Sequence, residues 1–102
     1  MAIEPHEIKR LTIRGIVQKI GFRMWTERKA LRLGLDGWVR NRLDGSVEIV
    51  IAGAPSAVAQ LIEHCRSGPP LARVDSIEVE EASEQDLSSR RPGEAFSLLP
   101  TV

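Results

Sequence analysis

Apolar and polar residues alternate along this chain with two different periods, which predict a succession of strands and helices. Residues 10–17 alternate strictly, the pattern of a half-buried strand. Gly21 then interrupts the chain, and bulky apolar side chains recur every three or four positions over residues 22–33, as in an amphipathic helix. Gly34 stands where a glycine commonly ends a helix. The first third of the chain is therefore a predicted strand followed by a predicted helix.

A β-hairpin and a second helix are predicted next. Residues 35–42 and 47–51 are rich in strand-forming side chains, and Asp44-Gly45 between them is a dipeptide typical of tight hairpin turns. The helix follows between Pro55, which the first turn of a helix tolerates, and Gly68. Its apolar stripe consists of four residues at helical spacing: Val58, Leu61, Ile62 and Cys65.

The last part of the sequence is less regular. Residues 73–80 form a fourth predicted strand, with an imperfect alternation at Asp75-Ser76 that indicates a β-bulge. Residues 81–94 are polar and lack a period, which predicts a long loop. A short strand over residues 96–99 is expected before a free tail at residues 100–102.

The predicted order of elements, β-α-β-β-α-β with an extra strand at the end, is typical of the α+β ferredoxin-like fold, a split βαβ sandwich. Its two helices cover one face of an antiparallel sheet. A chain of 102 residues has room for a single core, so we expect one domain over residues 1–102 with an N-terminal tail at residues 1–8. Because this fold carries many unrelated activities, function has to be inferred from a site.

The net charge of zero hides an uneven distribution of charge. Residues 9–42 contain ten basic and two acidic side chains, whereas residues 43–102 contain four basic and ten acidic ones. A basic region favours anionic partners such as phosphate esters, nucleic acid or an acidic protein. The alternative interpretation is that these charges form the solvated faces of a strand and a helix.

The composition excludes several classes of protein. One cysteine cannot form an internal disulfide, and two histidines do not supply a Cys/His metal site. Cys65 is expected in the core and His64, one position off the apolar stripe, in solvent. No apolar run approaches the length that crosses a membrane, and residues 1–10 lack the apolar segment of a secretory signal. We therefore expect a cytoplasmic protein with no membrane partner.

The junction between the first strand and the first helix is the candidate functional site, because a strand, a short loop and a helix start follow one another within residues 15–23. The first N–H groups of a helix have no acceptor inside it, and the helix dipole is positive there, so a loop wrapped over this end can bind a phosphate. Arg23 in the first turn would add a guanidinium to that anion. Alternatively, Gly15 and Gly21 serve only the turn and Arg23 is a surface residue.

Three sequence blocks resemble the signature of the acylphosphatase family. They are G-I-V-Q-K-I-G-F-R at residues 15–23, L-G-L-D-G-W-V-R-N at residues 33–41 and D-G-S-V-E at residues 44–48. The spacing is intact to about residue 53, and a weaker resemblance continues to Phe96. The family has the ferredoxin-like fold with an additional strand at the end, which agrees with the order of elements predicted above.

The resemblance implies hydrolysis of the carboxyl–phosphate bond of an acyl phosphate to a carboxylate and inorganic phosphate. It implies that Asn41 orients the attacking water and that no cofactor or metal is used. The phosphoryl group would be bound by Arg23 and by the backbone of five loop residues: Gln18, Lys19, Ile20, Gly21 and Phe22. Because neighbouring residues of a strand point to opposite faces, Arg40 and Arg42 are expected in solvent rather than in the site. We expect a monomer whose partner is its small acyl phosphate substrate.

Lys19 departs from the family pattern, which commonly has glycine at this position. If the loop requires a positive φ there, lysine costs about 1 kcal/mol or more. The loop could then sit differently, or Lys19 could add a second cation beside the phosphate. We predict a weakened or reshaped loop that still supports activity.

Two other functional classes remain open. The same loop could hold phosphate, sulfate or an acidic partner without turnover; similar domains also occur within larger carbamoyl-transferring maturation enzymes, although this chain shows no companion domain. RNA-recognition domains share the order of elements, but they display stacking aromatics on an open sheet face. Here Phe22 and Trp25 fall on a predicted helix, and no Lys/Arg-Gly-Phe strand motif is present. We therefore expect no nucleic-acid partner.

Overall fold

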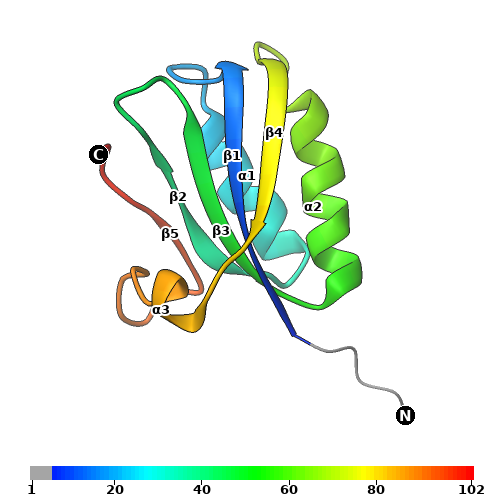
Figure 1. Cartoon of the computed structure of the whole chain (residues 1–102), viewed down its shortest axis with the longest axis vertical. Helices are drawn as coiled ribbons and strands as arrows, with labels where there is room; N and C mark the ends of the chain where they lie inside the picture. Colours follow the sequence, from blue (N-terminus) through cyan, green and yellow to red (C-terminus); the bar gives the residue numbers. More distant parts are fainter. Residues whose placement is uncertain (1–5) are drawn as a thin grey trace.

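The computed structural model describes residues 6–102 and shows a five-stranded sheet with α1 and α2 packed together against one face (Figure 1). The elements in chain order are β1 (Glu7–Ile16), α1 (Phe22–Arg32), β2 (Asp36–Asn41), β3 (Val47–Gly53), α2 (Pro55–Ser67), β4 (Arg73–Glu81), α3 (Glu84–Leu87) and β5 (Phe96–Leu98). The predicted ferredoxin-like architecture is confirmed. Residues 1–5 of the expected N-terminal tail lie outside the described residues, and Glu7 and Ile8, also assigned to that tail, belong to β1.

The strands lie in the order β4-β1-β3-β2-β5. The first four are antiparallel to their neighbours, whereas β5 runs parallel to β2 and places Phe96 opposite Gly37. The sheet is therefore mixed, and the expectation of a purely antiparallel sheet is wrong at this edge. The alternation of three residues predicts a strand but carries no information on its direction.

The core lies between the sheet and the two long helices. Alternate side chains of the central strands face the helices and are fully buried, among them Leu11, Ile13, Ile49 and Ile51. Cys65 of α2 is buried in the same core, as predicted. Burial raises the pKa of the Cys65 thiol to about 12, so the thiol stays protonated at neutral pH and is no nucleophile.

The segment expected to be a long loop, residues 81–94, contains the one-turn helix α3. Ser83 and Asp86 form a reciprocal capping box, in which the Ser83 side chain accepts from the Asp86 N–H and Asp86 accepts from the Ser83 N–H. Leu87 is buried against Trp38, whose indole N–H donates to the Asp86 carbonyl at 2.8 Å. A single turn is too short to show a helical period, so only the Ser-x-x-Asp spacing signalled it.

The predicted bulge lies at Asp75. Arg14 pairs with Ser76 and the next residue, Gly15, pairs with Val74, so Asp75 has no partner across the strands. Gly15 has a φ of 136°, and a Cβ atom there would lie 2.0 Å from the carbonyl oxygen of Arg73. Only glycine therefore fits where β1 passes the bulge and enters the candidate loop.

A buried carboxylate on the sheet face opposite α1 and α2 is paired with three arginines. Glu48 is 5% exposed and accepts hydrogen bonds from Arg40 Nε at 2.7 Å, Arg10 Nε at 3.0 Å and Arg42 Nη1 at 3.0 Å. Arg10 also reaches Asp86 at 3.0 Å, which ties α3 to the sheet. Burial alone would raise the pKa of Glu48, but the hydrogen bonds and charges of Arg40 and Arg42 outweigh it, and the pKa is lowered. The expectation that Arg40 and Arg42 are simply solvated is corrected: both are half-buried and paired.

We expect Glu48→Gln to lower the free energy of unfolding by about 2 kcal/mol at neutral pH, because the three guanidiniums lose their shared negative charge. Since the folded pKa lies below the ordinary value of 4.5, this contribution is complete above that value and disappears as the pH falls through the folded pKa. Thermal unfolding of the two proteins, followed from neutral pH into acid, should therefore converge. A difference in stability between the two proteins that stays constant in acid would contradict this role of the Glu48 carboxylate.

Candidate active site

The candidate site is built by the loop between β1 and α1 and by the first turn of α1. The residue before the helix, Gly21, has a φ of 80°, no side chain caps the helix start, and no acidic residue lies in its first turn. The first helical N–H to find a backbone acceptor is that of Trp25, which donates to the Gly21 carbonyl at 3.0 Å. The N–H groups ahead of it are left for an external acceptor, and the dipole of α1 favours an anion there.

The Gln18 side chain fastens this loop to the β2–β3 hairpin. Its Nε2 donates to the carbonyl oxygens of Arg42 and Ser46, both at 2.8 Å. Asp44 in turn accepts from the Ser46 N–H at 2.9 Å and from its hydroxyl at 2.6 Å. The Gln18 side chain thus has a structural task, and only its backbone is available to a phosphoryl group. The loop is held next to the end of β2, where Asn41 lies.

Lys19 has a φ of 65°, the one positive φ of a non-glycine residue in the described chain. The conditional expectation of a left-handed conformation at this position is therefore met. Lysine adopts a conformation that suits glycine, with the cost that a Cβ atom brings in this region.

We expect Lys19→Gly to raise the free energy of unfolding by about 0.5–1 kcal/mol, since relief of the left-handed conformation exceeds the greater chain entropy of unfolded glycine. Chemical denaturation of the two proteins measures this difference. Unchanged stability together with unchanged kinetics would remove any special role for Lys19.

A small pocket of about 120 Å³ brings the two predicted catalytic residues together. Its lining consists of Val17, Lys19, Gly21, Phe22, Arg23, Met24 and Asn41. No carboxylate and no histidine lines it. Of the remaining predicted site residues, Gln18 turns to the hairpin, and Ile20 is half-buried against the core. Met24 was not predicted to line the pocket, because no sequence motif includes a methionine in the first turn of a helix. Its position three residues after Gly21 is the only feature of the sequence that could have indicated it.

Three polar side chains of this pocket, those of Lys19, Arg23 and Asn41, have no partner in residues 6–102, and the two predicted catalytic residues are among them. Asn41 is 9% exposed, and its Oδ1 is a buried acceptor with no hydrogen bond. Such an atom costs about 1–3 kcal/mol unless something in the pocket donates to it. Arg23, the second residue of α1, is half-buried and makes no ion pair within the described chain. The Asn41 Oδ1 can therefore accept a hydrogen bond from a group in the pocket, and the Arg23 guanidinium can bind an anion.

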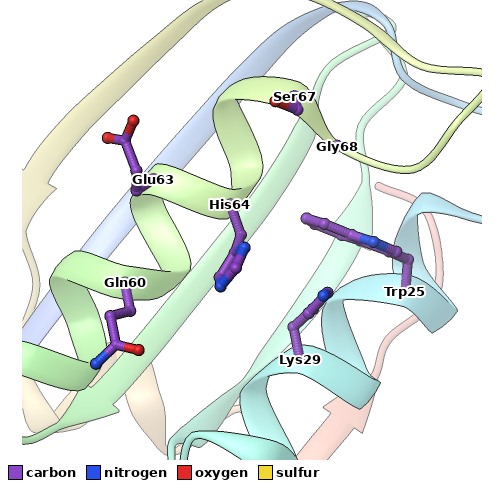
Figure 2. A pocket seen from close by; sticks show the side chains of 7 residues that line it. All are labelled: Trp25, Lys29, Gln60, Glu63, His64, Ser67 and Gly68. Atoms are coloured by element: carbon purple, nitrogen blue, oxygen red, sulfur yellow. The ribbon is translucent and has the colours of Figure 1, made fainter.

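A larger groove of about 470 Å³ lies between α1 and α2 and contains neither Arg23 nor Asn41 (Figure 2). Trp25 and Lys29 from α1 and His64 from α2 point into the space between the helices. The Lys29 ammonium lies 5.8 Å from the centre of the Trp25 ring, so these two groups already interact. His64 is exposed, as predicted.

None of the described aromatics is exposed on the open face of the sheet, where RNA-recognition domains stack bases. Phe22, Trp38 and Phe96 are buried, and Trp25 faces the groove between the helices rather than the sheet. Trp38 does lie on the sheet face opposite α1 and α2, but Leu87 and the Arg40 guanidinium, 4.7 Å above its ring, cover it. Within residues 6–102 no three His, Cys, Asp or Glu side chains gather as a metal site would need, and none of the helices there could span a membrane.

Comparisons with known proteins identify the family of this chain. The sequence model of the family described as Acylphosphatase matches residues 9–91. The chain belongs to the acylphosphatase family. A curated acylphosphatase from Nitrobacter winogradskyi is 57% identical over 98 residues, covering 95% of this chain and 99% of the relative.

Solved acylphosphatase structures share the fold. The acylphosphatase of Coxiella burnetii is 31% identical with a TM-score of 0.79, over 92% of this chain and 93% of the other. The acylphosphatase of Bacillus subtilis is 33% identical with a TM-score of 0.77, over 90% and 97% of the two chains. The resemblance inferred from the three sequence blocks is thus confirmed over nearly the whole chain.

Proposed function

We propose that this acylphosphatase-family chain hydrolyses acyl phosphates at the pocket between the β1–α1 loop and the end of β2. The backbone N–H groups from Gln18 to Phe22 and the Arg23 guanidinium bind the phosphoryl group, and Asn41 orients the attacking water. The observation that carries the proposal is the buried Oδ1 of Asn41, which lacks a partner in the described chain and lies in the same pocket as Arg23.

Phosphoryl transfer requires positioning and charge stabilisation more than covalent chemistry. The water oxygen forms a bond to phosphorus while the bond from phosphorus to the acyl oxygen breaks, and the electron pair leaves with the carboxylate. One water proton passes to a phosphoryl oxygen, so the products are a carboxylate and dihydrogen phosphate. Fixed amide dipoles and the permanently charged Arg23 stabilise the equatorial oxygens. A carboxylate is a good leaving group, which suits a pocket lined by no carboxylic acid and no histidine.

Asn41 distinguishes a hydrolase from a phosphate-binding module, the second candidate. A module that only holds an anion needs the cradle and Arg23, and leaves the Asn41 amide without a task. An asparagine can accept from a water and donate at the same time, which fixes the direction of approach. The buried acceptor therefore favours turnover. The monomeric state, the cytoplasmic compartment and the absence of a nucleic-acid partner remain predictions of the sequence.

The test is hydrolysis of benzoyl phosphate by the purified protein in the presence of a chelator. We expect turnover that the chelator does not reduce, with inorganic phosphate as a competitive inhibitor. Phosphate that binds without any turnover would favour the binding module, and a protein that neither binds phosphate nor hydrolyses the substrate would refute both functions.

A further inference from the structure

Lys19 combines a costly backbone conformation with a side chain that the fold does not use. Its φ of 65° would suit glycine, yet the chain places a lysine there. The side chain is exposed and makes no hydrogen bond or ion pair with any residue in 6–102. Strained residues that persist at a site point to a role in that site, because nothing in the packing of the fold calls for them.

The basic side chains near Lys19 differ from the others of this protein because they have no carboxylate partner. Most basic side chains of the described chain have a carboxylate partner, such as Lys9 with Glu81 and Arg14 with Glu78. The ones without such a partner all fall between residues 19 and 32; they are Lys19, Arg23, Arg28, Lys29 and Arg32. Lys29 interacts with Trp25 instead. Lys19 and Arg23 are the two that line the small pocket, and no carboxylate there neutralises them.

The size of the pocket indicates that Arg23 and Lys19 contact different parts of the substrate. At about 120 Å³ it is far smaller than the roughly 300–1,000 Å³ of pockets that enclose a whole small molecule. A phosphoryl group in the cradle next to Arg23 therefore leaves the acyl group projecting past the rim. Lys19 is exposed at that rim, on a stem of four carbons whose ammonium can follow a charge outside the pocket.

We propose that Lys19 is a specificity-determining residue, and that this chain favours acyl phosphates whose acyl group carries a second negative charge. The proposal rests on the proposed function, because the phosphoryl group has to occupy the cradle before the acyl group meets Lys19. The ammonium then pairs with the second anionic group in solvent, a contact whose strength falls with salt.

Two rigid substrates of equal shape test this preference. They are 4-carboxybenzoyl phosphate and its neutral counterpart 4-carbamoylbenzoyl phosphate, whose para position prevents attack of the carboxylate on its own acyl group. For each protein the ratio of kcat/KM for the charged and the neutral substrate is measured. Comparing this ratio between proteins cancels the different intrinsic reactivities of the two substrates.

We expect Lys19→Gln to lower the ratio by up to about fivefold at low ionic strength, the range of an exposed ion pair. Lys19→Arg should retain the wild-type ratio, and molar salt should bring wild type to the value of Lys19→Gln. The matched control is Arg28→Gln, which removes one unpaired positive charge of α1 that lies outside the pocket. It should leave the ratio unchanged.

Three results would overturn the proposal. If Lys19→Gln slows both substrates equally, Lys19 acts on the phosphoryl group and not on the acyl group. If Arg28→Gln lowers the ratio as much as Lys19→Gln does, the preference comes from the overall positive charge of this region and not from a contact with Lys19. If wild type hydrolyses neither substrate nor benzoyl phosphate, the proposed function itself has failed, which is distinct from hydrolysis with an unchanged ratio.

Discussion

Replacing Arg23 by alanine or glutamine is expected to lower kcat/KM for benzoyl phosphate by about a thousandfold, which corresponds to about 4 kcal/mol of transition-state stabilisation. Arg23 is the permanently charged side chain of the pocket that lies in the first turn of α1, beside the free amides. Neither substitute carries a charge to balance the phosphoryl oxygens. Steady-state kinetics of the variants and of wild type measures the effect.

The Arg23 variants should fold normally, because Arg23 forms no ion pair within residues 6–102. Their thermal unfolding should match that of wild type. Arg28→Ala provides a control on the same helix, since Arg28 is exposed and outside the pocket. Arg23 variants that keep wild-type kinetics would place phosphoryl binding elsewhere.

Asn41→Ala is expected to lower kcat by about a hundredfold while the inhibition constant for inorganic phosphate changes little. Its amide contacts the attacking water in our account, whereas the cradle and Arg23 hold the phosphoryl group without it. The magnitude is that of removing one positioning group from an active site. Measuring kcat and phosphate inhibition on the same preparation separates the two tasks.

Stability distinguishes this role from a structural one. The Oδ1 of Asn41 is a buried acceptor with no partner in the described chain, so its removal should not lower the melting temperature. Normal turnover by Asn41→Ala would show that the water is oriented by another group. Weakened phosphate binding with an unchanged kcat would assign Asn41 to the cradle instead.

The elements with strong periods could be predicted from the sequence. The stripe from Val58 to Cys65 and the alternation in residues 10–17 depend on burial against one core, which local patterns report well. Two features depended on tertiary partners instead. The direction of β5 is set by its pairing with β2, which the three residues of β5 do not reveal by themselves. The single turn of α3 is stabilised by a cap and by packing on Trp38.

The candidate site shows the same division. Arg23 and Asn41 were predicted to share one site, and both line the same pocket. The partners of Gln18 could not be foreseen, because its two acceptors lie 24 and 28 residues away on another turn. Arg40 and Arg42 were expected in solvent since alternation alone does not reveal that Glu48 is buried between them.

The most direct test of the central claim is the structure of a crystal soaked in sulfate, a tetrahedral anion that resembles the phosphoryl group. We expect the anion at about 2.7–3.1 Å from the backbone nitrogens of the β1–α1 loop and within hydrogen-bond distance of the Arg23 guanidinium, with a water on Asn41 Oδ1. Sulfate bound only elsewhere, with the loop amides turned away from the pocket, would contradict the account.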